Sequence, residues 1–323
     1  MFSRPAFEMI ETNGVRLRCV VEGDGPLAIM VHGWPESWYS WRHQIAPVRA
    51  AGYRVVVPDV RGYGGSDAPA ALEAYDMESI VGDVLGLIGH FGEEQAVLIG
   101  HDWGAPIVWN TTALHPARVR AVAALSVPYS PRGKISSIAL WRQIYANRFF
   151  YQLYFQEPGR AEAEFEADIR TALRKIYFSG SGDAPRGLFR TDKPADARML
   201  DDLPDPPALP AWLTEEDLDY YVSQFQKTGF RGSLNRYRAQ ERDWERLTAL
   251  NGAHITRPAC FIAGSRDGVL RFVPGVDLVA HMKRWVDDLR GCTLIEGAGH
   301  WIQQERPAEV NAALLAFLAT LKN

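Results

Sequence analysis

A short apolar segment that turns sharply into a helix constrains this chain more than any other stretch. Residues 96–99 form an unalternated apolar run, typical of a strand buried in a parallel sheet, and residues 105–114 predict a helix. Gly100 and Gly104 flank Asp102 at two positions on either side. In a strained strand-to-helix turn, side chains at these glycines would collide with backbone. The pattern is typical of a nucleophile elbow with Asp102 as nucleophile, although Asp is also a favoured helix N-cap.

Strands and helices alternate over the first 127 residues. The dipeptide Asn13-Gly14, between residues 7–11 and 15–21, predicts a two-residue hairpin. Apolar runs at residues 26–31, 53–58 and 119–127 predict further strands, and residues 77–91 have helical periodicity. This alternation predicts an α/β fold with a mostly parallel central sheet flanked by helices. The carboxyl ends of its strands, and the loops after them, should meet at one edge.

The alternation of strands stops between about residues 128 and 251. Residues 161–178 and 214–227 predict amphipathic helices, whereas residues 180–210, with four prolines near their end, predict a loop. Strands resume at residues 259–263 and 292–295, and residues 307–321 predict a final helix. We therefore expect a core of residues 1–128 and 252–323, with a helical domain, residues 129–251, inserted between its halves as a cap.

Composition excludes some classes of partner. The 323 residues carry a net charge of -4, and the Arg and Lys residues are dispersed, so neither nucleic acid nor an anionic membrane is expected. Cys19, Cys260 and Cys292 lie far apart in apolar segments, which favours small hydrophobic side chains in a reducing compartment over disulfides or a metal site. Residues 1–13 lack the apolar core of a signal peptide, and no long apolar stretch occurs. We expect a cytoplasmic protein.

Three further loops at the same predicted edge carry residues that a nucleophilic Asp102 would need. Asp267 follows one strand, His300 follows another, and residues 32–35 (HGWP) follow a third. The chain order of nucleophile, acid and histidine is that of an α/β-hydrolase triad. Taken alone, Asp267 could simply stabilise a turn, and His300 could simply cap a helix. Their coincidence at one edge favours a catalytic interpretation, whereas His101 is expected to pack structurally and His32 to brace its loop.

The residue types define a chemistry for these loops. Asp102 is ionised at neutral pH, so it can attack an electrophilic sp³ carbon without a base and form an ester. His300, oriented by Asp267, would then activate a water molecule that hydrolyses this ester. The backbone N–H groups of Trp34 and Trp103 are the expected donors to the oxyanion that forms on Asp102.

The motifs carry a family resemblance. The segments HGWPESWYSW, DVRGYGGSD, GHDWG, GSRD and GHW, with residues 151–159 and 229–238 of the inserted region, resemble those of epoxide hydrolases of the α/β-hydrolase fold superfamily. The resemblance is to the soluble type and covers its hydrolase domain, from about residue 7 to the C-terminus. It implies an α/β-hydrolase fold, no cofactor or metal, and lid tyrosines at Tyr151 and Tyr237.

The lid tyrosines make chemical sense. An epoxide opens to an alkoxide, a poor leaving group unless it is hydrogen-bonded or protonated, and two phenol groups can supply the proton. The neighbouring Tyr154 is an alternative candidate for the lid tyrosine assigned to Tyr151. The implied substrates are water and a small hydrophobic or aryl epoxide, in a pocket lined by apolar aromatic residues. The expected lining residues are Trp34, Trp38, Trp103, Phe155 and Trp301.

Two alternatives stay open at this point. A haloalkane or haloacid dehalogenase would share the Asp nucleophile, the histidine and the fold, and Trp103 could serve it as a halide donor. A non-catalytic ligand-binding protein could use the same scaffold, although the full set of reactive residues speaks against it. A serine esterase is excluded by Asp102. A homodimer is possible.

Overall fold

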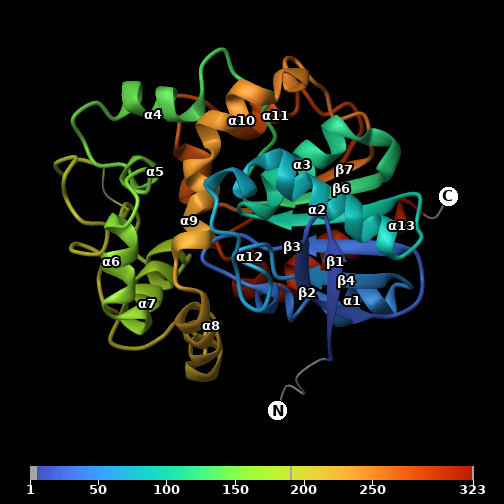
Figure 1. Cartoon of the computed structure of the whole chain (residues 1–323), viewed down its shortest axis with the longest axis horizontal. Coiled ribbons are helices and arrows are strands. Elements are labelled where there is room, and N and C mark those ends of the chain that lie inside the picture. The colour runs from blue at the N-terminus through green and yellow to red at the C-terminus, as the bar shows by residue number, and fades with distance from the viewer. Residues whose placement is uncertain (1–5, 190, 322–323) are drawn as a thin grey trace.

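An eight-stranded sheet forms the centre of the molecule in the computed structural model, which describes residues 6–189 and 191–321 (Figure 1). The strands are β1 (Phe7–Thr12), β2 (Val15–Glu22), β3 (Leu27–Val31), β4 (Arg54–Pro58), β5 (Ala96–His101), β6 (Val119–Leu125), β7 (Ala259–Gly264) and β8 (Leu289–Ile295). Their order across the sheet is β1-β2-β4-β3-β5-β6-β7-β8. The β1–β2 and β2–β4 pairs are antiparallel, and the others are parallel. The predicted mostly parallel sheet is therefore confirmed.

Helices flank the sheet and fill the segment between β6 and β7 (Figure 1). The helices are α1 (Ile45–Ala50), α2 (Met77–His90), α3 (Gly104–Leu114), α4 (Ser137–Ile144), α5 (Tyr151–Tyr154), α6 (Arg160–Glu166), α7 (Ile169–Gly180), α8 (Glu215–Thr228), α9 (Arg231–Arg238), α10 (Gln240–Arg246), α11 (Leu278–Met282), α12 (Ile302–Glu305) and α13 (Pro307–Ala319). Short 3-10 helices include η1 (Trp38–Trp41) and η2 (Leu72–Tyr75). No helix within residues 6–189 and 191–321 has the length and apolar character needed to cross a membrane.

The hairpin at the start of the chain follows the predicted turn. Asn13 and Gly14 both have positive φ angles, 47° and 78°, as a type I′ turn requires. This turn pairs Thr12 with Val15 and fixes the register back to Phe7 and Val20. The Asn-Gly signal therefore predicted both the hairpin turn and the register of its strands.

Burial of the strands explains their apolar sequences. The central strands β3, β5 and β7 are buried along their whole length because helices cover both faces of the sheet. Ile29 and Leu98 face the side of α2 and α3, whereas Met30 and Ile99 face the side of α1 and α13. The edge strand β8 is mostly exposed. Of the three cysteines expected to act as small hydrophobic side chains, Cys19 and Cys260 are buried, whereas Cys292 is exposed on β8.

The region between β6 and β7 holds α4 to α10, and α5 to α8 gather at the left of the sheet in Figure 1. The expected cap boundaries, residues 129 and 251, lie between the end of β6 and the start of β7 and stay a prediction. The single helix predicted over residues 161–178 is wrong, because α6 ends before Asp168. The Asp168 side chain accepts a hydrogen bond from the Thr171 N–H and starts α7. Expectations that fall on residues 1–5 and 190 lie outside the described residues.

Candidate active site

The turn between β5 and α3 has the geometry that its glycines predict. Asp102 has a φ of 49°, in the left-handed region that non-glycine residues rarely adopt. A Cβ atom on Gly100 would lie 2.1 Å from the Gly104 carbonyl oxygen, and one on Gly104 would lie 2.0 Å from the Val31 carbonyl oxygen. Gly33 is equally constrained, since its Cβ atom would lie 2.3 Å from that of Asp102. The turn therefore projects Asp102 from the carboxyl end of β5 and depends on these three glycines.

The Asp102 carboxylate does not cap α3. The N-terminus of this helix has no side-chain capping bond. Instead, Asp102 Oδ1 accepts a hydrogen bond from the Trp34 backbone N–H at 2.7 Å, and Oδ2 lies 3.2 Å from His300 Nε2. Trp34 thus occupies the position expected of an oxyanion donor, while the second expected donor, Trp103, directly follows Asp102 at the start of α3.

His300 connects two carboxylates. Its Nδ1 atom lies 3.2 Å and 3.1 Å from the two carboxylate oxygens of Asp267, and its Nε2 atom faces Asp102. Burial alone would lower the pKa of His300, but the Asp267 and Asp102 carboxylates raise it well above its ordinary value. Burial would conversely raise the pKa of Asp102, but hydrogen bonding and charge from His300 lower it. The structure brings together the three predicted triad residues, with Asp267 buried and the side chains of Asp102 and His300 only slightly exposed.

The two predicted lid tyrosines face the same place from the inserted helices. Tyr151 begins α5 and Tyr237 lies near the end of α9, with their ring centroids 6.0 Å apart. Burial raises the pKa of both phenols above their ordinary value, and the nearby Asp102 charge raises it further. Both groups are therefore protonated donors. Tyr154 is occupied elsewhere, because its hydroxyl group donates to Glu164 Oε2 at 2.7 Å.

Two cavities border Asp102. Their volumes are about 350 Å³ and about 440 Å³, and Asp102, Tyr151 and Tyr237 line both. The predicted aromatic lining is divided between them, with Trp34 and Trp301 on the first cavity and Trp103 on the second. The space beside Asp102 therefore extends in two directions.

The other two predicted pocket residues do not fit the structure. Trp38, on η1, is turned away from the cavities, and its indole N–H donates to the Tyr220 hydroxyl at 2.6 Å. Phe155 is fully buried behind the lid tyrosines, with its ring centroid 5.4 Å from that of Tyr151 and 5.0 Å from that of Tyr237. Phe155 therefore supports the tyrosines, and neither ring lines the two cavities beside Asp102.

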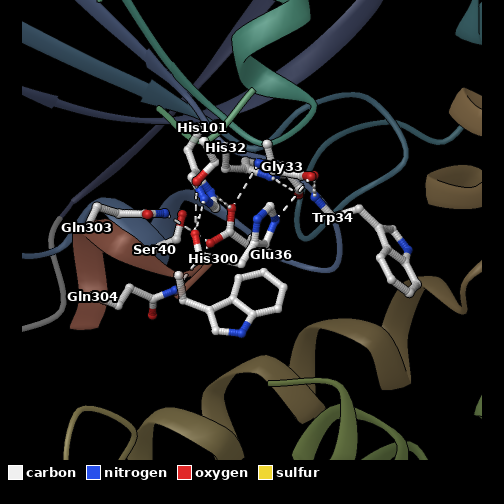
Figure 2. A network of polar contacts seen from close by, with 12 residues as sticks. His32, Gly33, Trp34, Glu36, Ser40, His101, His300, Gln303 and Gln304 are labelled. Atoms are coloured by element: carbon white, nitrogen blue, oxygen red, sulfur yellow. Dashed lines mark hydrogen bonds and ion pairs between the residues drawn. The ribbon is translucent and has the colours of Figure 1, made fainter. Parts of the chain in front are cut away.

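A buried polar network that includes Glu36 and His101 lies beside His300 and was not recognised from the sequence (Figure 2). Glu36 Oε2 accepts from the Gly33 N–H at 3.0 Å and lies 2.9 Å from His101 Nδ1. His101 Nε2 in turn lies 2.7 Å from the His300 carbonyl oxygen. Burial would raise the pKa of Glu36, but His101 and the Gly33 bond lower it. An acidic residue within the aromatic segment HGWPESWYSW was the available signal.

Two glutamines complete this network, and His32 behaves as predicted. The side-chain amides of Gln303 and Gln304 donate to Glu36 Oε1 at 3.0 Å and 3.1 Å. His32 Nε2 accepts from the Val60 N–H at 3.0 Å and so braces its own loop. Among residues 6–189 and 191–321, no group of three or more His, Cys, Asp or Glu side chains is arranged to hold a metal ion.

Comparison with known proteins agrees with this geometry. Residues 26–307 match the alpha/beta hydrolase fold family. The chain is 46% identical to epoxide hydrolase A of Mycobacterium tuberculosis over 98% of both proteins. The chain belongs to the epoxide hydrolase family. This epoxide hydrolase is also 41% identical to rat bifunctional epoxide hydrolase 2, with 95% of the chain matching 54% of that longer protein.

Solved structures show the same relationship for this epoxide hydrolase. The crystal structure of epoxide hydrolase A from Mycobacterium thermoresistibile superposes with a TM-score of 0.92 at 48% identity, over 98% of both chains. An epoxide hydrolase from an endophytic Streptomyces gives a TM-score of 0.94 at 45% identity, over 98% of this chain and 96% of the other. The α/β-hydrolase fold expected from the resemblance is confirmed.

Proposed function

We propose that this enzyme converts epoxides to vicinal diols through an ester on Asp102. The observation that carries the proposal is the pair of protonated phenols, Tyr151 and Tyr237, lining the same cavities as the nucleophilic carboxylate. An Asp102 oxygen bonds to an epoxide carbon while the bond from that carbon to the ring oxygen breaks. The resulting alkoxide takes a proton from a tyrosine, which lowers the barrier to ring opening.

Hydrolysis of the ester would use the other half of the site. His300 takes a proton from water, and the water oxygen adds to the carbonyl carbon of the Asp102 ester. The Trp34 N–H, 2.7 Å from Asp102 Oδ1, is aimed at the oxygen that becomes negative in this step. Collapse of the intermediate releases the diol and regenerates the carboxylate, and the proton that His300 took from water returns to the tyrosinate left by ring opening. Asp267 holds the imidazole ring and stabilises its positive charge.

The same charges control when His300 acts as a base. In the free enzyme, two carboxylates favour the imidazolium form of His300. Formation of the ester removes the charge of Asp102, and with it one of the influences that raise the His300 pKa. The histidine therefore loses its proton more easily once the ester has formed, which is when a neutral base is needed.

This control predicts a measurable pKa change in Asp102→Asn, a neutral isostere of the nucleophile. We expect the pKa of His300, followed by NMR titration of its ring nitrogens, to be lower in the variant than in the wild type. In the wild type, the interactions that raise the His300 pKa also stabilise the folded protein. This stabilisation is complete at pH values below the pKa of unfolded histidine, and it is lost as pH rises through the pKa of His300 in the folded protein. An unchanged or higher His300 pKa in the variant would contradict this control.

A cap formed by residues 129–251 would supply the tyrosines and much of the pocket. We propose apolar epoxides, including aryl ones, as substrates, supported by the aromatic residues on both cavities. The dehalogenase alternative is disfavoured because the side chain of Trp103, its candidate halide donor, already forms a hydrogen bond with Tyr237. A cytoplasmic location and a homodimer stay predictions.

Labelled water tests whether an ester is formed. In a single turnover of styrene oxide by excess enzyme in water enriched in oxygen-18, we expect an unlabelled diol, because its new oxygen comes from Asp102. The label should instead appear in the peptide that contains Asp102, detected by mass spectrometry after digestion. A labelled diol in the first turnover would show direct attack by water and would overturn the proposed mechanism.

A further inference from the structure

The carboxylate of Glu305 is buried against the loop that carries His300 but takes no part in the proposed chemistry. Glu305 ends α12 and is 5% exposed. Its Oε2 atom accepts hydrogen bonds from the N–H groups of Gly182 at 2.8 Å and Gly299 at 2.9 Å, and Oε1 accepts from the Trp301 N–H at 3.0 Å. No Lys or Arg in the described part of the chain forms an ion pair with it. Backbone N–H groups therefore replace a cation as its partners.

Two of these three bonds enclose the catalytic histidine. Gly299 and Trp301 directly precede and follow His300, so Glu305 fixes the peptide groups on both sides of it. The backbone of His300 is also held, since its N–H donates to the Gly180 carbonyl at 2.8 Å and its carbonyl accepts from the Ser126 hydroxyl at 3.1 Å. We call these hydrogen bonds to the backbone of residues 299–301 the backbone cradle of His300. They set the direction in which its imidazole ring projects.

The third bond joins the cradle to the inserted helices. Gly182 follows the end of α7 and lies against the histidine loop so closely that a Cβ atom on it would be 2.1 Å from the Gly297 carbonyl oxygen. A Cβ atom on Gly299 would in turn be 2.3 Å from the Gly182 nitrogen. The Trp301 indole N–H adds a bond to the Tyr177 carbonyl on α7 at 2.8 Å. Glu305 therefore joins the end of α7 to the loop that carries the base.

We propose that Glu305 is a positioning residue for ester hydrolysis, whose carboxylate holds the His300 loop against the end of α7 and so keeps the imidazole over the Asp102 ester. The proposal rests on the proposed function, because it assigns His300 to the hydrolytic step. The attack of Asp102 on the epoxide needs no base. Displacement of His300 should therefore slow the second step and leave the first nearly unchanged.

Glu305→Gln is the variant that tests this role. The amide offers one acceptor oxygen, and its NH₂ group faces a backbone N–H, so at least one of the three bonds is lost. With styrene oxide in rapid-quench experiments, we expect hydrolysis of the ester to slow by about 10- to 100-fold, as a small displacement of a catalytic group can cause. Ester formation should stay within about twofold of the wild type. Glu309→Gln, an exposed change on α13, is the matched control and should leave both steps unchanged.

The possible outcomes separate this role from a merely structural one. Equal slowing of both steps in folded Glu305→Gln, or an unchanged rate of hydrolysis, would overturn the proposal. If that variant does not fold, Glu305→Asp is measured with the same expectation, because its shorter side chain keeps the charge but cannot reach all three N–H groups. No ester on Asp102 in His300→Gln would instead refute the proposed function, independently of Glu305.

Discussion

Replacement of His300 by glutamine is expected to stop the reaction at the ester on Asp102. A carboxamide cannot take a proton from water at neutral pH, so hydrolysis should slow by about 10²- to 10⁴-fold. Ester formation should persist, because Asp102 is a nucleophile in its ionised form. After treatment with styrene oxide, the intact mass of His300→Gln should therefore rise by the mass of one epoxide. Peptide mapping should locate the addition at Asp102.

This trapping experiment also separates the alternative functions. His90→Gln, an exposed change at the end of α2, is the matched control and should turn over without a stable adduct. An adduct of His300→Gln with a primary alkyl halide but not with the epoxide would favour dehalogenation. The absence of an adduct with either compound would favour a ligand-binding role and contradict the assignment of Asp102 as nucleophile.

Local chemistry explains what the sequence predicted well. The spacing of Gly100, Asp102 and Gly104 predicts the turn because close backbone contacts forbid other residues there. The hairpin at Asn13-Gly14 is similarly determined by two positive φ angles. The sheet edge then brings Asp267 and His300 together, since the carboxyl ends of parallel strands lie side by side. These inferences needed only short-range rules and the regularity of a parallel sheet.

Contacts between distant segments explain what the sequence could not predict. Glu36 and His101 are 65 positions apart, and nothing in either local pattern indicates that they share a hydrogen bond. The direction in which a side chain points also cannot be predicted from the local sequence. Trp38 lies in the aromatic segment after β3, but its ring points toward Tyr220 rather than toward Asp102. Glu305 resembles an ordinary helix residue until the fold brings Gly182 to it. Polar networks and pocket linings therefore depend on tertiary placement.

The double variant Tyr151→Phe/Tyr237→Phe is expected to abolish ring opening while the fold is kept. Without either phenol, the developing alkoxide has no proton donor, and loss of general acid catalysis should slow ester formation by about 10²- to 10⁴-fold. Each single variant should lose less, because both tyrosines line the same two cavities and the remaining phenol can still donate. Rapid-quench measurement of ester formation with styrene oxide gives the rate, and thermal unfolding tests the fold.

Tyr154→Phe is the matched control, because Tyr154 lies three positions after Tyr151 but its hydroxyl group bonds to Glu164 rather than facing the cavities. We expect this control to form the ester at nearly the wild-type rate and to lose about 1 kcal/mol or more of unfolding free energy, since the buried Glu164 loses a donor. The double variant should differ from this control in rate rather than in stability. Its ester formation is slowed, while loss of the 3.0 Å bond from Gln152 to Tyr151 costs about 1 kcal/mol, as in the control, and both rings keep their apolar contacts as Phe. Wild-type ester formation in the double variant would assign the proton donor to another group. Slowed ester formation in Tyr154→Phe would mean that general loosening of the inserted helices, rather than loss of a proton donor, limits the rate.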